Sequence, residues 1–144
     1  MQLTTLRDYK GRYLIGFQDG TMKAKEATSS VQSQFQIVSI NDTTVAFRNV
    51  LGQFLAAVDD NTLMWDRDSI GAWEEYTMEQ HGTKSAFKTF HNDYLSVTED
   101  GAFLRGISAV GPQEHGLFEI EDMCKTGNSL AYSKLIFMLN QIKL

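Results

Sequence analysis

The residues whose side chains could carry catalysis or bind a metal ion are few and lie far apart in the chain. The three histidines are His81, His91 and His115, and the single cysteine is Cys124. None of these residues has another histidine or cysteine at the short spacing that zinc ligands usually show. The sequence therefore predicts no metal ion and no cofactor.

Two short segments begin like known site motifs and then depart from them. Residues 66–71, Asp-Arg-Asp-Ser-Ile-Gly, start like a calcium-binding loop. However, Ile70 occupies the third ligand position, and Thr77 stands where a bidentate glutamate belongs. The segment that begins at Gly106, Gly-Ile-Ser-Ala-Val, lacks the second glycine of a nucleophile elbow. These departures favour a binding protein over an enzyme.

The clearest pattern in the chain is a segment that occurs three times. Residues 4–14, 45–55 and 85–95 align without a gap, at a spacing of about 40 residues. Such a repeat indicates three copies of one supersecondary unit. Five aligned positions hold residues of the same kind: Leu6, Phe47 and Phe87; Arg7, Arg48 and Lys88; Gly11, Gly52 and Asn92; Tyr13, Phe54 and Tyr94; and Leu14, Leu55 and Leu95.

Each unit carries the signals of four short strands. Glycine and asparagine tolerate a positive φ, so Gly11 and its two equivalents predict a tight hairpin turn. A second turn is predicted in each unit at Asp19-Gly20, Asp60-Asn61 and Asp100-Gly101. Apolar residues alternate with polar ones at the end of each unit, which is typical of a strand with one buried face. The predicted core is Leu6, Leu14, Met22, Phe35, Ile37, Phe47, Leu55, Leu63, Tyr76, Met78, Phe87, Leu95, Phe103, Phe118 and Ile120.

With these units the chain resembles the fascin-like β-trefoil family, which includes fascin and hisactophilin. The shared repeat opens as in Leu6-Arg7 and Gly11-Arg12-Tyr13-Leu14 and closes as in Phe35-Gln36-Ile37, over residues 3 to about 122. The resemblance implies an all-β protein, a β-trefoil of three four-stranded units that closes into a barrel. It also implies binding or bundling of actin filaments without catalysis. Fascin has four such trefoils where this chain has one, so bundling would need a dimer or a second filament site.

The charge is distributed unevenly along the chain. The net charge of −5 argues against nucleic acid as a partner, because nucleic-acid binding needs a basic surface. Residues 1–25 nevertheless hold five basic side chains against two acidic ones, whereas residues 59–79 hold seven acidic against one basic. Because actin filaments are acidic, the first unit is the expected contact if actin is the partner, whereas for any single charge the favoured interpretation is a surface that keeps the domain soluble. The candidate partner-binding residues are Lys10, Arg12, Lys23 and Lys25.

The two tryptophans lie among acidic residues in the second unit. Trp65 precedes Asp66-Arg67-Asp68, and Trp73 precedes Glu74-Glu75. An exposed tryptophan in such surroundings could stack on a sugar or on the cation of a partner. Trp73 stands three residues before Tyr76 and could equally cover the barrel, and we favour this structural role for it.

The chain after the third unit departs from the threefold plan. We expect a β-trefoil domain at residues 1–122 and an apolar extension at 123–144. The spacing of apolar residues in the extension favours a helix, and the run 135–139 could instead form a strand. This segment must be covered, first of all by its own barrel, next by the same segment of a second copy in a homodimer, and last by a membrane surface. The residues of this candidate interface are Leu135, Met138, Leu139 and Ile142.

Two other functions stay open on the sequence. Ricin-type β-trefoil lectins carry Gln-x-Trp near the end of each repeat, and this motif is absent here, although other trefoil lectins do without it. An enzyme inhibitor would act through an exposed loop such as residues 106–116. The single cysteine and the lack of a charged-then-apolar leader favour the cytoplasm as the location.

Overall fold

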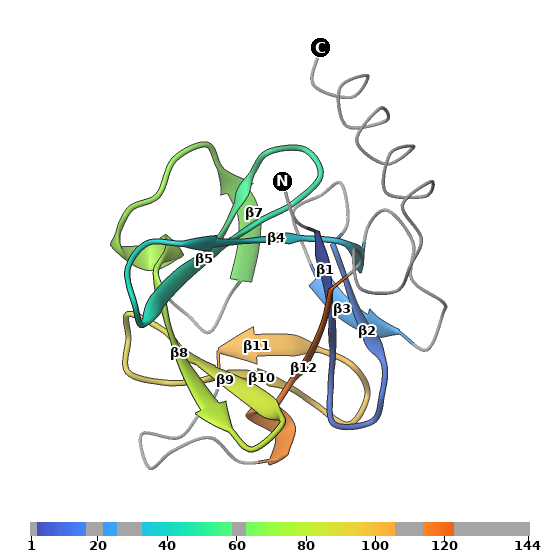
Figure 1. Ribbon diagram of the computed structural model, residues 1–144. Coiled ribbons are helices and arrows are strands. Elements are labelled where there is room, and N and C mark those ends of the chain that lie inside the picture. The colour runs from blue at the N-terminus through green and yellow to red at the C-terminus, as the bar shows by residue number, and fades with distance from the viewer. Residues whose placement is uncertain (1–2, 17–21, 26–32, 59–62, 106–113, 123–144) are drawn as a thin grey trace.

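The computed structural model describes residues 3–16, 22–25, 33–58, 63–105 and 114–122, and these residues form an all-β protein (Figure 1). In the described ranges no helix is long and apolar enough to cross a membrane. The strands are β1 (Thr4–Arg7), β2 (Tyr13–Gly16), β3 (Met22–Lys25), β4 (Gln36–Ser39), β5 (Thr44–Arg48), β6 (Phe54–Ala57), β7 (Leu63–Arg67), β8 (Tyr76–His81), β9 (Lys84–Lys88), β10 (Leu95–Val97), β11 (Phe103–Arg105) and β12 (Glu119–Asp122). Two short 3-10 helices, η2 (Ala72–Glu74) and η3 (Glu114–Gly116), precede β8 and β12.

The barrel closes because the last strand of each unit pairs with the first strand of the next. The antiparallel pairs β4–β5, β8–β9 and β12–β1 place equivalent residues opposite one another, Ile37 with Phe47, Met78 with Phe87 and Ile120 with Leu6. Pairing of β5 with β8 and isolated bridges from Thr4 to Phe35 and from Ser85 to Phe118 complete the ring. The first and last strands are thus hydrogen-bonded, and the predicted β-trefoil is confirmed.

The remaining strands form three hairpins, one for each unit. They are β2–β3, β6–β7 and β10–β11, each antiparallel. A bridge between Lys23 and Ala102 and a backbone hydrogen bond of 2.9 Å from Ala24 N to Gly101 O join the first hairpin to the third. This junction places the first unit, with its basic residues, beside a turn of the third unit.

The core contains the residues that the repeat predicts. Twelve of the fifteen predicted core residues are buried, and Ile37, Met78 and Ile120 are partly buried and pack against them. Trp65 belongs to this core as well, with only 2% of its surface exposed and its ring stacked on Phe35 at 5.2 Å. The expectation that Trp65 could stack on a ligand was therefore wrong, because strand β7 alternates and turns Leu63 and Trp65 inward.

The first turn of each unit has the geometry that the repeat predicts. Gly11, Gly52 and Asn92 have φ of 77°, 81° and 67°, and the amide of each donates to the carbonyl three residues earlier. At the second turn, Gly101 has φ of 93°, as predicted for the third unit. The equivalent turns at Asp19-Gly20 and Asp60-Asn61 lie outside the described residues.

The C-terminal segment, residues 123–144, also lies outside the described residues, as does the loop at 106–113. The helix of the extension and its candidate interface therefore stay predictions. The boundary at 122 between the two segments stays a prediction too.

Candidate functional site

Strand β3 carries two of the predicted contact residues on one exposed face. Lys23 and Lys25 are exposed, whereas Met22 and Ala24 between and beside them are buried. This alternation follows from the period of two in a strand with one buried side. Lys23 lies opposite Ile15 and Lys25 lies opposite Tyr13 on the neighbouring strand β2. Both ammonium groups therefore project from the same side of the first hairpin.

Lys10 lies at the tip of the first turn and is also exposed. Its Nζ lies 3.4 Å from Oε2 of Glu99, in the second turn of unit three, and both side chains are largely open to solvent. An exposed pair of this kind contributes little to stability and is easily given up to a partner. Because Lys23 is bridged to Ala102, the turn at residues 98–102 lies beside Lys23 as well as beside Lys10.

Arg12 has a different role from the three lysines. It is 7% exposed, and its Nε donates to Oδ2 of the buried Asp8 at 2.8 Å. Its Nη1 and Nη2 donate to the carbonyl oxygens of Glu99 and Thr98 at 2.8 and 2.9 Å. The guanidinium thus fastens the first turn of unit one to the second turn of unit three. The prediction that Arg12 offers its charge to a partner does not fit this burial, and we leave Arg12 out of the proposed contact.

Arg7 lies on the same face, although it was not among the contact residues predicted from the sequence. Arg7 on β1 pairs in register with Tyr13, which in turn pairs with Lys25, so the three side chains follow one row across the sheet. The Arg7 guanidinium lies 5.1 Å from the centre of the Tyr13 ring and donates to Glu121 Oε1 at 3.0 Å. The hydrogen bond to Glu121, above all, raises the pKa of Arg7. Its position in the repeated Arg/Arg/Lys column was the signal that could have indicated it.

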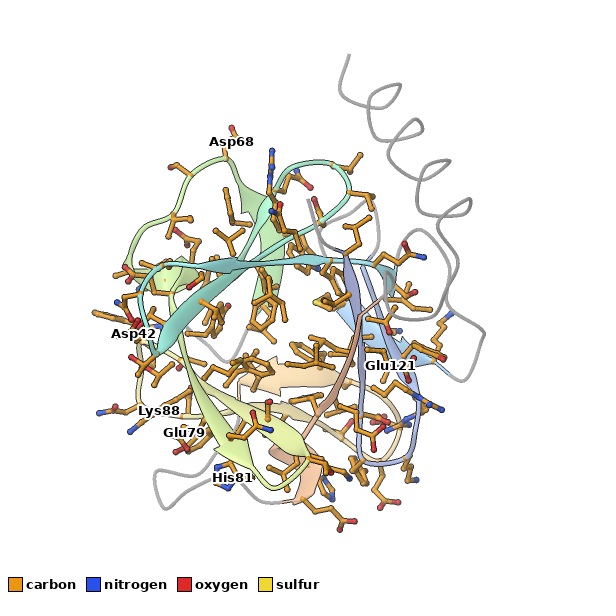
Figure 2. All side chains as sticks on the ribbon, viewed as in Figure 1. Asp42, Asp68, Glu79, His81, Lys88 and Glu121 are labelled. Atoms are coloured by element: carbon orange, nitrogen blue, oxygen red, sulfur yellow. The ribbon has the colours of Figure 1, made fainter. Side chains whose placement is uncertain are left out.

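The face that these residues form is hereafter the basic surface, defined as Arg7, Lys10, Lys23 and Lys25. Its charge is mixed, because Glu121, which Figure 2 labels, pairs with Arg7, and Glu99 pairs with Lys10. The two lysines of β3 belong to it through their exposure on one side of the strand. Electrostatic attraction to an acidic partner is what this arrangement can provide.

A second group of polar side chains lies on the β8–β9 hairpin. Tyr94 Oη donates to both carboxylate oxygens of Glu79 at 3.0 Å, and His81 Nε2 lies 3.3 Å from Oε1 of the same group. Burial and this hydrogen bond raise the pKa of Tyr94. Figure 2 shows Glu79 and His81 together at the end of the hairpin. Among the described residues, no three histidine, cysteine or carboxylate side chains come close enough to hold a metal ion.

Comparison with known families identifies the domain. The family model of the fascin domain matches residues 23–120, about two thirds of the chain. The chain belongs to the fascin domain family. This is a non-enzymatic β-trefoil family whose members generally bind actin.

The fascin domain match includes Lys23 and Lys25 but begins after Lys10 and Arg12. The comparison with curated proteins gave no match. The family assignment thus rests on most of the trefoil, from strand β3 to strand β12, and agrees with the closed threefold ring described above.

Proposed function

We propose that this fascin-domain protein binds actin filaments through the basic surface, with Lys23 and Lys25 as the main contacts. The observation that carries the proposal is the fascin domain match over residues 23–120, which contains both lysines. The exposure of both side chains on one face of β3 supports it. We also propose that the protein acts without catalysis, in the cytoplasm, in keeping with its single cysteine.

Electrostatics account for the choice of this surface. The chain as a whole has a net charge of −5, so an acidic filament would be repelled by most of it. The first 25 residues differ, with five basic side chains against two acidic ones, and residues 123–144 hold three lysines and no acidic residue. Arg12 is buried, whereas Lys10, Lys23 and Lys25 are exposed, so these lysines supply the charge that a filament would meet.

Co-sedimentation with filamentous actin at high speed tests the binding. We expect the wild-type protein to pellet with filaments, and the double reversal Lys23→Glu and Lys25→Glu to weaken binding about tenfold. The matched control is Lys84→Glu with Lys88→Glu on β9, which changes the total charge equally and should bind as the wild type does. Binding should also weaken as salt rises above about 0.1 M, where exposed charges are screened beyond roughly 10 Å.

The same experiment can contradict the proposal at two levels. If the β3 reversal and its control bind equally well, the basic surface is not the contact. If the wild type fails to pellet at any salt concentration, the actin proposal fails and the family fold alone remains.

Bundling is a further step that we attribute to the extension. We propose a homodimer through residues 123–144, which would give two trefoils and two filament sites. Low-speed pelleting of filaments should then occur for the wild type and be lost in the variant Leu135→Ser with Ile142→Ser, while high-speed pelleting persists. Low-speed pelleting that is equal for both proteins would rule out the tail-dependent dimer.

A further inference from the structure

Two junctions of the barrel are built on the same plan but are covered differently. The second residue of the first hairpin turn is Tyr9 in unit one and the equivalent Phe90 in unit three. A 3-10 helix faces each of these turns, and its middle residue is His115 in η3 for unit one and Trp73 in η2 for unit three. In the first junction the Tyr9 and His115 rings stack at 4.2 Å with an angle of 11°. In the second junction, Phe90 is 61% exposed. The Trp73 ring instead lies near the ring of His91, the residue that follows Phe90, with 5.9 Å between the ring centres. We call the first the closed junction and the second the open junction.

Next to the open junction the surface is hollowed. A shallow depression of about 690 Å³ is lined by residues 68–74, with Trp73 in its wall. Ile70 in this lining is 38% exposed, and it adds an apolar surface to that of Trp73. Large exposed apolar side chains that gather at a depression are typical of a binding surface.

His91 holds the aromatic side of this junction in place. Its Nε2 lies 2.8 Å from the carbonyl oxygen of Ala57, and because a carbonyl can only accept, Nε2 carries the proton. The Phe90 ring meets the His91 ring edge-on at 5.7 Å. Trp73, His91 and Phe90 therefore form a fixed aromatic platform that extends from η2 to the first turn of unit three.

The depression is acidic. Two of its lining residues are acidic, the exposed Asp68 and the buried Glu74, and the half-buried Glu75 follows directly after η2, outside the lining. Figure 2 shows Asp68 on the outer side of the loop between β7 and η2, directed away from the barrel. Glu74 is different, because its carboxylate accepts a hydrogen bond of 2.7 Å from the amide of Gly71 and serves to close the helix start. Residues 59–79 as a whole hold seven acidic side chains and one basic one.

From this juxtaposition we propose that the open junction binds a cationic peptide segment of a protein partner, with an arginine or lysine side chain on Trp73 and beside Asp68. A cation gains from both parts of the surface, since it is attracted to an aromatic face and to nearby carboxylates. A neutral sugar could stack on the ring and donate hydroxyl hydrogen bonds to Asp68, but it would gain no attraction between opposite charges. The basic surface and the open junction are thus two separate sites of opposite charge, the first for an acidic filament and the second for a basic segment.

Fluorescence anisotropy with a labelled nona-arginine peptide tests this site on the full-length protein, at about 0.1 M salt. We expect Trp73→Leu to weaken binding about fivefold through loss of the cation–aromatic contact, and Asp68→Asn to weaken it about threefold. The matched control is Glu114→Gln, which removes an exposed carboxylate beside the closed junction and should leave binding unchanged. A labelled nona-glutamate peptide should not bind.

Three outcomes would overturn the proposal. Equal weakening by Asp68→Asn and Glu114→Gln would mean general attraction to an acidic protein, and unchanged binding in both Trp73→Leu and Asp68→Asn would exclude the site. Binding of neutral glycans that depends on Trp73, without binding of the arginine peptide, would assign the depression to carbohydrate. Asp68→Asn is a surface change that leaves the fold intact, so a folding defect of Trp73→Leu does not prevent a decision. Actin co-sedimentation should be unchanged by Asp68→Asn, which separates this test from that of the proposed function.

Discussion

The closed and open junctions have the same backbone and differ in what their side chains do. In both, the first turn of a unit makes the same two backbone hydrogen bonds. In the closed junction the amide of Asp8 donates to the carbonyl of Arg12, and the amide of Gly11 donates to the carbonyl of Asp8. In the open junction the amide of Thr89 donates to the carbonyl of Asp93, and the amide of Asn92 donates to the carbonyl of Thr89. In the closed junction, Arg12 and the stack of Tyr9 on His115 fill the space between units. In the open junction the equivalent Phe90 extends into solvent.

This difference shows how a symmetric fold can separate stability from recognition. The repeated turn fixes the backbone in each copy, because its hydrogen bonds need only a suitable first residue and a residue that accepts a positive φ. The side chains at the other positions are then free to diverge. One copy has become a fastening between units, and another presents an aromatic and acidic surface.

The largest expected effect comes from removing the fastening. Arg12→Met leaves the buried Asp8 carboxylate without its cation, and we expect the free energy of unfolding to fall by about 3 kcal/mol. The measurement is urea unfolding monitored by tryptophan fluorescence. An unchanged m value would show that the wild type and the variant unfold between the same two states.

The control for this change lies in the second unit, at the equivalent residue Gln53. Gln53 accepts a hydrogen bond of 3.2 Å from Asn49 Nδ2, and both groups are neutral. We expect Gln53→Met to cost about 1 kcal/mol. A cost for Arg12→Met as small as this would show that the closed junction is not fastened by charge, and would return Arg12 to the candidate contacts.

The second-largest effect concerns the turn that Arg12 holds. A Cβ at Gly101 would lie 2.7 Å from the carbonyl oxygen of Ala24, and its φ of 93° is one that side chains rarely adopt. We expect Gly101→Ala to lower the free energy of unfolding by about 2 to 3 kcal/mol, measured by the same urea titration.

Gly82 offers the matched control for that substitution. It has φ of 66°, and a Cβ there would meet no atom within 4 Å. Gly82→Ala should therefore cost only the backbone strain, about 1 kcal/mol. Equal losses in the free energy of unfolding for the two variants would mean that the backbone contact between the first and third hairpins can shift to make room for the added Cβ.

The direct comparison of the two junctions has a smaller expected effect. Tyr9→Ala removes a ring that packs on the core and on His115, and we expect a loss of about 2 kcal/mol in stability. Phe90→Ala removes a ring that is 61% exposed and should change stability by less than about 0.5 kcal/mol. Tyr9→Phe, which keeps the stack, serves as the control. Thermal unfolding would show whether the two alanine variants differ, and similar losses would mean that the open junction is as much a part of the fold as the closed one.

Most of the fold could be predicted because its signals are local and repeated. The hairpin turns at Gly11, Gly52 and Asn92 follow from residue types that accept a positive φ. Because these residues occupy equivalent positions in the three units, each predicted turn supports the other two. The core followed from alternation within strands of known spacing. Trp65 was misjudged because its acidic neighbours suggested exposure, although its spacing from Leu63 by two residues already placed both on one side of a strand.

The site was less predictable because its decisive contacts join residues that are distant in sequence. Arg12 is 86 residues from Thr98 and 87 from Glu99, whose carbonyls take its donors, and nothing near Arg12 indicates either. Arg7 and Lys25 share a row only because β2 lies between their strands. The open junction, likewise, depends on a contact between Trp73 and His91 that spans two units. Composition identified the charged segments, but pairing in space decided which charges remain exposed.

The smallest expected effect is a pKa in the turn beside the closed junction. The Thr98 hydroxyl donates to Asp100 and, foremost among several hydrogen bonds, lowers the pKa of that exposed carboxyl below its ordinary value of 3.8. The folded state thus binds the proton less readily than the unfolded chain does, so this interaction favours folding above the ordinary pKa and is lost as the pH falls through the lowered one. Thr98→Val should raise the pKa of Asp100 toward its ordinary value, as measured by carboxyl carbon chemical shifts during an NMR titration. The backbone amide signals of residues 71–74, beside the open junction, provide the internal reference, and their positions should be the same in both proteins because Thr98 acts only on its own turn. A change in these amide signals together with that of Asp100 would instead indicate that the two junctions respond as one unit, and the separation between fastening and recognition would fail.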